Sequence, residues 1–327
     1  MKTKNITSTI LIICLCISMC AVSCTDRTNS EETGEIVPDP ITMNTDFPLP
    51  DSLPDGEGER VKVILLLGQS NATGCSITEY LKNNIEASEF ERYSNGFPSV
   101  LINYCLDDHN ATSNGEFRKV DLTCGAANGF FGPEVGMADV LSSAYPDEKI
   151  IILKYTMSGY TLHYHWLSGG ERGAIYNAFL KFAETYMNYL IGKNYDAKIG
   201  AICWMQGESD TTEFKAAHYY DNQTAFVSYL RSDLSKYAEN GGIYFIDAGI
   251  SNSPYCEPSY PEINEAKKLF SEQSPMNIYF STIDAGLTVR KEPEGDPDWG
   301  HYDSLSGLKL GHLFGQYIIQ SYDSRGE

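Results

Sequence analysis

The chain has 327 residues, of which 42% are apolar and 21% charged, and these are ordinary values for a globular protein with a sizeable core. Its 44 acidic and 24 basic side chains give a formal net charge of −20. Because binding to phosphates requires clustered Lys and Arg, this charge argues against nucleic acid as a partner.

The first 23 residues have the pattern of an export signal. Lys2 and Lys4 precede an almost continuous apolar run from Ile10 to Val22, which is too short for a comfortable transmembrane helix. The segment resembles a bacterial lipoprotein signal, in which cleavage precedes a cysteine that is then lipidated, and Cys24 follows small residues. We therefore predict export and lipid anchoring through Cys24 at the bacterial cell envelope, on the periplasmic or the outer surface. An ordinary secretory leader and a retained membrane anchor are the alternatives.

Residues 24–60 are predicted to form a flexible tether. They are rich in Pro, Asp, Glu, Thr and Gly, and prolines recur at positions 38, 40, 48, 50 and 54. Such a composition breaks regular elements and favours a semi-extended spacer. The tether would hold a single domain, residues 61–327, away from the membrane, so that the anchor is the only membrane contact.

Short apolar runs alternate with helical patterns after the tether. The first run, Val61 to Leu67, is nearly continuous, which is typical of a strand buried on both faces. Further runs lie at 150–153, 199–204, 243–246 and 278–280, and helical patterns lie at about 134–144, 174–191, 218–237 and 304–322. This alternation predicts a parallel sheet with helices on both faces. The stretches 75–128 and 155–173 lack periodicity and are predicted to be long loops that shape a site.

Five cysteines remain after the leader, at positions 75, 105, 124, 203 and 256. The number is odd and the spacing fits no paired metal motif, so one or two disulfides are possible but no full framework is indicated. Cys203 lies inside an apolar run and is predicted to be a small buried residue.

A candidate nucleophile follows the first predicted strand. In open parallel sheets, ligands bind beyond the carboxyl ends of the strands, and the first strand ends in the string GQSNATG at 68–74. A serine on the tight turn between a strand and a helix is exposed and can attack a substrate, so Ser70 is the candidate. A serine that only caps the following helix would occupy the same place.

A candidate base stands near the other end of the chain. Asp298 precedes His301 by three residues, just before the last helical pattern. A carboxylate at this spacing can orient the imidazole and stabilise its charged form, leaving the other ring nitrogen for a serine hydroxyl. A solvated loop would also explain the string.

Two further segments could stabilise a developing oxyanion. Gln206 follows the apolar run at 199–204, so its amide could donate a hydrogen bond over the same edge of the sheet. Gly132 offers a backbone N–H just before Pro133, which suits the first position of a helix. Capping of the helices that follow would explain both segments equally well.

Together these segments resemble the SGNH hydrolases, and within them the carbohydrate acetylesterases typified by sialate O-acetylesterases and family 6 acetylxylan esterases. The matching strings, between about residues 61 and 320, are GQSN at 68–71, FGPE at 131–134, WMQGESD at 204–210 and DWGHYDSLSGLKLG at 298–311. The resemblance implies a three-layer α/β/α domain with a five-stranded parallel sheet of flavodoxin-like order. Position 72 is Ala, which breaks the G-x-S-x-G pattern of the α/β-hydrolases.

The resemblance also implies roles for the candidate residues. Ser70 would be the nucleophile, His301 its base and Asp298 the carboxylate that orients the base. The oxyanion hole would consist of the backbone N–H groups of Ser70 and Gly132 and the side-chain amide of Gln206. No cofactor and no metal are implied, and the implied substrate is an acetyl ester on a sialate or xylan-type glycan.

Four further residues are predicted to contact the substrate. Tyr160 and Trp166 lie in the aperiodic 155–173 stretch, and aromatic faces with polar edges suit sugar rings, although core packing is an equal alternative. Gln69 and Asn71 flank the candidate nucleophile.

Three alternatives remain open at this point. Glu208 could share or replace the role of Asp298 in supporting the histidine. A metal-dependent deacetylase could use His163 and His165 with Asp296 or Asp298 as ligands, although no motif supports this. A non-catalytic glycan-binding lipoprotein could retain the same fold. The esterase prediction requires positions 70 and 301 to meet at one edge of the sheet.

Overall fold

The computed structural model describes residues 37–50, 53–291 and 297–326. The predicted signal segment, Cys24 and Asp296 lie outside the described residues. The chain divides into two units, residues 1–40 and 41–327, and the second contains the elements described below. Within the described residues no helix has the length and apolarity needed to cross a membrane.

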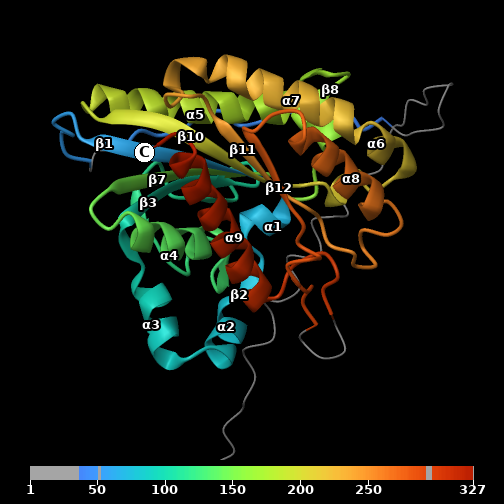
Figure 1. Cartoon of the computed structure of the whole chain (residues 1–327), viewed down its shortest axis with the longest axis horizontal. Helices are drawn as coiled ribbons and strands as arrows, with labels where there is room; N and C mark the ends of the chain where they lie inside the picture. Colours follow the sequence, from blue (N-terminus) through green and yellow to red (C-terminus); the bar gives the residue numbers. More distant parts are fainter. Residues whose placement is uncertain (1–36, 51–52, 292–296, 327) are drawn as a thin grey trace, which may run out of the picture. The chain divides into compact units, whose positions relative to one another are not determined.

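The second unit is built on one mostly parallel sheet (Figure 1). Its strands follow the order β12-β11-β10-β1-β7-β3-β4, and β5 also pairs with β3. Neighbours from β12 to β3 are parallel, whereas β4 and β5 are antiparallel to β3. The strands are β1 (Arg60–Gly68), β3 (Phe97–Leu106), β4 (Ala111–Thr112), β5 (Arg118–Val120), β7 (Lys149–Thr156), β10 (Asp196–Met205), β11 (Tyr244–Ala248) and β12 (Asn277–Phe280).

The predicted fold class is confirmed, with one parallel strand more than expected. All five predicted strands are present, and their order β7-β1-β10-β11-β12 is the flavodoxin-like one. The sixth, β3, lies in the 75–128 stretch that we predicted to be a loop. Its sequence FPSVLINYCL contains Pro98 and a polar Asn103, which interrupt the apolar run that marks a buried strand. Asn103 is nevertheless buried, and its amide donates to the Gly115 carbonyl at 2.6 Å.

Helices cover both faces of the sheet (Figure 1). The helices α5 (Ala174–Gly192) and α7 (Tyr219–Asp233) lie on one face, and α4 (Glu134–Ala144) and α9 (Ser304–Asp323) lie on the other, all close to their predicted bounds. The helix α8 (Tyr260–Ser271), which we did not predict, packs against α7 and β12. The shorter elements are α1 (Ser70–Thr73), β2 (Ser76–Ile77), α2 (Thr78–Asn84), α3 (Ala87–Asn95), β6 (Phe130–Phe131), a π-helical turn (Leu162–Trp166), β8 (Leu167–Ser168), β9 (Glu171–Arg172), α6 (Glu213–Ala217) and two 3₁₀ turns (Glu208–Asp210 and Ser235–Tyr237).

Part of the predicted tether packs on the domain. Phe47 is buried, and its ring stacks on His109 with a centroid distance of 5.1 Å. The Pro48 carbonyl accepts a hydrogen bond from the Tyr186 hydroxyl at 3.0 Å, and Leu53 is also buried. Burial of these apolar side chains holds this part of the predicted tether against the domain. The remaining boundaries of the signal segment and tether stay predictions.

All five cysteines that follow the leader are described, and they are free thiols. Cys203 is fully buried, as its apolar surroundings predict, and burial raises the pKa of its thiol well above the ordinary value. A buried thiol with a raised pKa is unreactive.

Candidate active site

The site lies at the carboxyl edge of the sheet, where three neighbouring strands end at the same level. Gly68 at the end of β1 pairs with Met205 of β10 on one side and Thr156 of β7 on the other. Gly68 has φ of 143°, and a Cβ atom there would lie 2.0 Å from the Met205 carbonyl oxygen. Only glycine fits this position, so the chain can turn sharply and begin α1 at Ser70.

Gln69 ties this turn to the loop that follows β10. Its backbone N–H donates to the Met205 carbonyl at 2.9 Å. Its side-chain oxygen accepts from the N–H groups of Gly207 at 3.4 Å and Ser209 at 3.2 Å. Gln69 is 2% exposed, so its contacts hold the two loops together inside the protein, whereas we predicted contact with substrate.

Asn71 fastens the turn to the residues on both sides of His301. Its Nδ2 donates to the Gly300 carbonyl at 3.1 Å, and its Oδ1 accepts from the Tyr302 N–H at 3.0 Å. The same Nδ2 donates to Oε1 of Glu208 at 2.6 Å. One buried side chain beside Ser70 therefore joins the segments that carry Ser70, Glu208 and His301.

His301 is held by Asp298, and Asp298 is shared with an arginine. Nδ1 of His301 lies 2.7 Å from Oδ2 of Asp298, and Oδ1 of Asp298 accepts from the Gly300 N–H at 2.9 Å. Nη2 of Arg290 lies 2.5 Å from the same Oδ2, and its Nη1 donates to the Cys75 carbonyl at 3.2 Å. The side chain of Cys75 is a second hydrogen-bonding neighbour of the imidazole.

Sequence reasoning missed Arg290. It stands eight residues before Asp298 in a segment without a motif, so no local signal marks it. The fold reveals it, because the Arg290 N–H donates to the His301 carbonyl at 2.8 Å and the Asp298 N–H donates to the Arg290 carbonyl at 3.0 Å. These two backbone hydrogen bonds pair the segments and place the Arg290 guanidinium beside the Asp298 carboxylate.

The electrostatics of the pair follow from these contacts. Burial alone would raise the pKa of Asp298, but the hydrogen bond from His301 and the charges of His301 and Arg290 outweigh it and lower the pKa to about 2. Burial alone would lower the pKa of His301. The neighbouring Cys75 and Asp298 outweigh it and raise the pKa of His301 well above 6.5. Asp298 is therefore a stable carboxylate at neutral pH, and the imidazolium is favoured.

Glu208 accepts a hydrogen bond from Asn71 and makes none with His301. It is fully buried, and one of its oxygens accepts from Asn71 while the other has no hydrogen-bond partner among the described residues. Burial raises the pKa of its carboxyl. Asp298 and not Glu208 is thus the carboxylate in contact with the imidazole.

The predicted oxyanion donor Gly132 already has an acceptor, whereas the backbone N–H of Ser70 has none within its helix. The Gly132 N–H donates to Oε1 of Glu134 at 2.9 Å, and Oε2 of Glu134 pairs with Nζ of Lys154 at 2.7 Å in a fully buried ion pair. Lys154 also donates to the Thr73 carbonyl at 2.9 Å and so holds the end of α1. The Ser70 N–H opens α1, and such an amide has no acceptor within its own helix.

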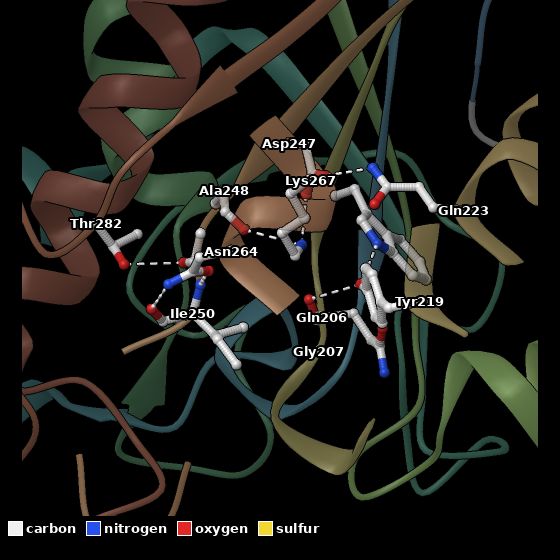
Figure 2. A network of polar contacts seen from close by, with 12 residues as sticks. Gln206, Gly207, Tyr219, Gln223, Asp247, Ala248, Ile250, Asn264, Lys267 and Thr282 are labelled. Atoms are coloured by element: carbon white, nitrogen blue, oxygen red, sulfur yellow. Dashed lines mark hydrogen bonds and ion pairs between the residues drawn. The ribbon is translucent and has the colours of Figure 1, made fainter. Parts of the chain in front are cut away.

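Gln206 is committed to a buried polar network behind the site. Its Nε2 donates to Oδ2 of Asp210 at 2.5 Å and to the Tyr160 carbonyl at 3.3 Å, and its Oε1 accepts from the Tyr219 hydroxyl at 2.9 Å. It is fully buried, so its amide is not available to an oxyanion in this arrangement. Figure 2 shows how the network continues behind this loop. The buried Lys267 pairs there with Asp247 at 2.5 Å.

Trp166 lies in the core, which is the packing alternative that the sequence left open beside substrate contact. Its side chain is 0% exposed, and its ring packs against Trp204 and Phe226 with centroid distances of 5.1 and 5.6 Å. The π-helical turn Leu162–Trp166 points the ring inward, which the sequence pattern did not reveal. Tyr160 is half-buried, with its ring edge-on to His165 at 4.8 Å.

The two histidines of this loop bond to neutral side chains. Nδ1 of His163 contacts the Asn222 amide at 2.9 Å, and Nδ1 of His165 contacts the Thr161 hydroxyl at 2.8 Å. In the part of the chain that the structure describes, no three His, Cys, Asp or Glu side chains gather as a metal site would require. Asp296 is outside that part.

The fold is shared with several solved structures. A protein from Arabidopsis thaliana has a TM-score of 0.57 at 19% identity, and the aligned region covers 79% of this chain and 98% of that one. NanS has a TM-score of 0.53 at 14% identity, with 82% and 99% covered. A carbohydrate acetylesterase from Xanthomonas citri has a TM-score of 0.50 at 14% identity, with 78% of this chain and 54% of that one covered. At these identities the likeness shows the fold.

Comparison with curated protein sequences gives no significant match. A family model does match, over residues 60–320, and its description is carbohydrate esterase, sialic acid-specific acetylesterase. This region is most of the chain and contains both the turn with Ser70 and the segment with Asp298 and His301. The chain therefore belongs to the carbohydrate esterase family of sialic acid-specific acetylesterases.

Proposed function

We propose that the chain hydrolyses O-acetyl esters of carbohydrates with Ser70 as the nucleophile, His301 as the base and Asp298 as the carboxylate that orients the base. The observation that carries the proposal is the pair of hydrogen bonds between the Asn71 side chain and the residues on both sides of His301. Because Ser70 precedes Asn71 directly, these bonds support a short path between the hydroxyl and the imidazole. Membership of the esterase family supports ester hydrolysis on a sugar.

The proposed reaction transfers the acetyl group to water in two steps. Oγ of Ser70 attacks the acetyl carbonyl carbon while Nε2 of His301 takes the hydroxyl proton, and Asp298 stabilises the imidazolium. The carbonyl oxygen becomes negative and is stabilised by the Ser70 N–H. The C–O bond to the sugar then breaks, and the sugar hydroxyl leaves with the proton from His301. Water attacks the acetyl-serine with the same base, and acetate leaves as Ser70 regains its proton.

The oxyanion needs more than one donor. Gly132 can supply the second only if its N–H leaves Glu134 when substrate binds, so we propose that this bond exchanges during the reaction. Candidate substrates are O-acetylated sialosides and acetylated xylan-type glycans, both of which carry an acetyl ester on a sugar residue.

Acetate release from p-nitrophenyl acetate and from both classes of glycan tests the proposal. Ser70→Ala is expected to reduce kcat by about 10⁴-fold or more, because no other group supplies the covalent step. Ser143→Ala, at an exposed position of α4, is the matched control and should leave the rate unchanged. A serine-directed phosphonate should label Ser70, as mass spectrometry of the peptide would show.

Two outcomes would contradict the proposal. Ser70→Ala protein that hydrolyses at the wild-type rate would remove the nucleophile assignment. Wild-type protein that binds glycans but releases no acetate would favour the glycan-binding alternative, and inhibition by chelators without labelling by phosphonate would favour a metal-dependent deacetylase.

A further inference from the structure

Two exposed aromatic side chains adjoin the candidate site. Among the described residues, Trp299 and Tyr255 are the aromatic side chains that are largely exposed, at 42% and 54%. Most other large apolar side chains are buried in the core. Aromatic rings with polar edges suit carbohydrate-binding surfaces, so the position of these two rings beside the site points to contact with a ligand.

Trp299 lies in the segment that holds the base. It stands between Asp298 and Gly300, two residues before His301. Its backbone is fixed on both sides, because the Gly300 N–H donates to Asp298 at 2.9 Å and the Gly300 carbonyl accepts from Asn71 at 3.1 Å. The indole is therefore carried by a fixed stretch of backbone and is still exposed.

Tyr255 reaches the same place from the loop after β11. A Cβ atom placed on Gly300 would lie 3.9 Å from Cγ and Cδ1 of the Tyr255 ring, so the ring lies beside the position of Gly300. The start of its loop is anchored by Asn264, which bonds both the N–H and the carbonyl of Ile250 at 2.8 and 2.9 Å (Figure 2). Thr282 also donates to the Gly249 carbonyl at 2.9 Å. The loop that carries this ring is thus anchored at its base before any ligand arrives.

We propose that Trp299 and Tyr255 form a stacking surface for the sugar ring that bears the acetyl ester. The inference rests on the proposed function, because an acetyl group at Ser70 places the ring to which it is attached within a few bonds of His301. A pyranose has an apolar face of C–H groups that packs on an aromatic ring, while its hydroxyls stay in contact with water. An anchored aromatic surface favours such binding, since little ordering is required when the sugar docks.

The test compares a substrate that contains a sugar with one that does not. For wild type, Trp299→Ala and Tyr255→Ala, kcat/KM is measured on an acetylated xylo-oligosaccharide, on an O-acetylated sialoside and on p-nitrophenyl acetate. The quantity of interest is kcat/KM for the sugar ester divided by kcat/KM for p-nitrophenyl acetate. Each alanine variant should lower this ratio about tenfold, mainly through KM, because one stacking contact is lost. The ring-retaining variants Trp299→Phe and Tyr255→Phe should recover part of the loss.

Leu269→Ala is the matched control. Leu269 is an apolar side chain on α8 with a similar exposure of 43%, and it is not among the described residues that form the candidate site. Its ratio should equal that of wild type. An unchanged ratio in the two aromatic variants would overturn the inference, and so would an equal loss on all substrates, which would mean that the rings only support the His301 segment. Failure of wild type on all substrates would instead reject the proposed function.

A binding measurement keeps the inference testable apart from turnover. The chain has three tryptophans, and Trp166 and Trp204 are fully buried. In Ser70→Ala protein, addition of acetylated xylo-oligosaccharide or sialoside should therefore shift the emission of Trp299 to shorter wavelength. The shift should vanish in the Ser70→Ala, Trp299→Phe double variant. Because the double variant lacks this reporter, its affinity is measured by isothermal titration calorimetry. An unchanged affinity would place the sugar elsewhere and overturn the inference.

Discussion

Two regions hold the candidate site, and they differ in burial. The turn region, residues 68–74, is almost entirely buried and rests on parallel strands and on the Lys154–Glu134 ion pair. The histidine segment, residues 288–291 and 297–302, is mostly half-exposed and is fixed by a few backbone bonds and by the contacts of Asn71 and Arg290. The nucleophile candidate is therefore positioned by core packing and the base by individual polar contacts. Damage to the first region should unfold the protein, whereas damage to the second should mainly reduce activity.

The largest expected effect is on the stability of the turn region. In Lys154→Met, the Glu134 carboxylate stays fully buried without its counter-ion. The free energy of unfolding should fall by about 3–5 kcal/mol, as measured by urea denaturation. The double variant Lys154→Met, Glu134→Leu should recover part of the loss, because a well-packed apolar pair avoids the desolvation cost.

Lys236→Met provides the control for this variant. Lys236 and Glu184 form an exposed pair at 2.9 Å, and exposed pairs contribute little to stability. Equal, small losses from both lysine variants would show that the buried pair does not support the turn region, and the contrast between the two regions would fail.

The second largest effect concerns Asn71, whose side chain links the two regions. Its removal should reduce activity more than it reduces stability. Asn71→Ala removes both bonds that bracket His301 and leaves one oxygen of Glu208 without its donor. Because misplacement of a catalytic group by about 1 Å can cost about 10²-fold, we expect a loss of that order in kcat/KM for p-nitrophenyl acetate. The accompanying loss of stability should be about 1–3 kcal/mol, from the unsatisfied buried group.

Glu208→Gln sharpens the same comparison. It keeps an acceptor for Asn71 but cannot carry charge, so activity should change by only a few-fold if Glu208 acts through Asn71. Asp298→Asn should cost far more, since Asp298 contacts the imidazole at 2.7 Å. A loss in Glu208→Gln as large as that in Asp298→Asn would favour Glu208 as the carboxylate that supports the base.

The smallest effect concerns Arg290 and appears in the pH profile. The base must be neutral to accept a proton, so kcat/KM should rise with pH through the pKa of His301, which lies above 6.5. Arg290 shares Oδ2 of Asp298 and adds positive charge near the imidazole, which disfavours the imidazolium. Its removal in Arg290→Gln should raise the pKa of His301 and move the acidic limb to higher pH.

Arg290→Lys keeps the charge and should move the limb less than Arg290→Gln. Circular dichroism at each pH checks that the profile reports titration and not unfolding. A limb that stays in place in both variants would show that Arg290 does not tune the base and only ties the segment to the Cys75 carbonyl.

Strand and helix patterns were predictable where the signal is local. Short stretches of sequence contain the whole pattern of the strand at Val61 to Leu67 and of the helix at 174–191. Both elements appear as predicted. The strand β3 was missed, because Pro98 and Asn103 break its pattern. The same limit explains Trp166, since nothing in its local sequence indicates whether an aromatic ring turns toward the core or toward solvent.

The sequence by itself determined the fold class, the family and the residue types at the site, because motifs at strand ends and the spacing of Asp298 and His301 are short-range properties. Only the tertiary structure decided which partners these residues have. It showed that Asp298 hydrogen-bonds to His301 and that Gln206 hydrogen-bonds to Asp210. It also showed that Asn71 links the loops around the site. Such contacts join residues up to 231 positions apart, as for Asn71 and Tyr302, and they exist only once the strands have set the loops at one edge of the sheet.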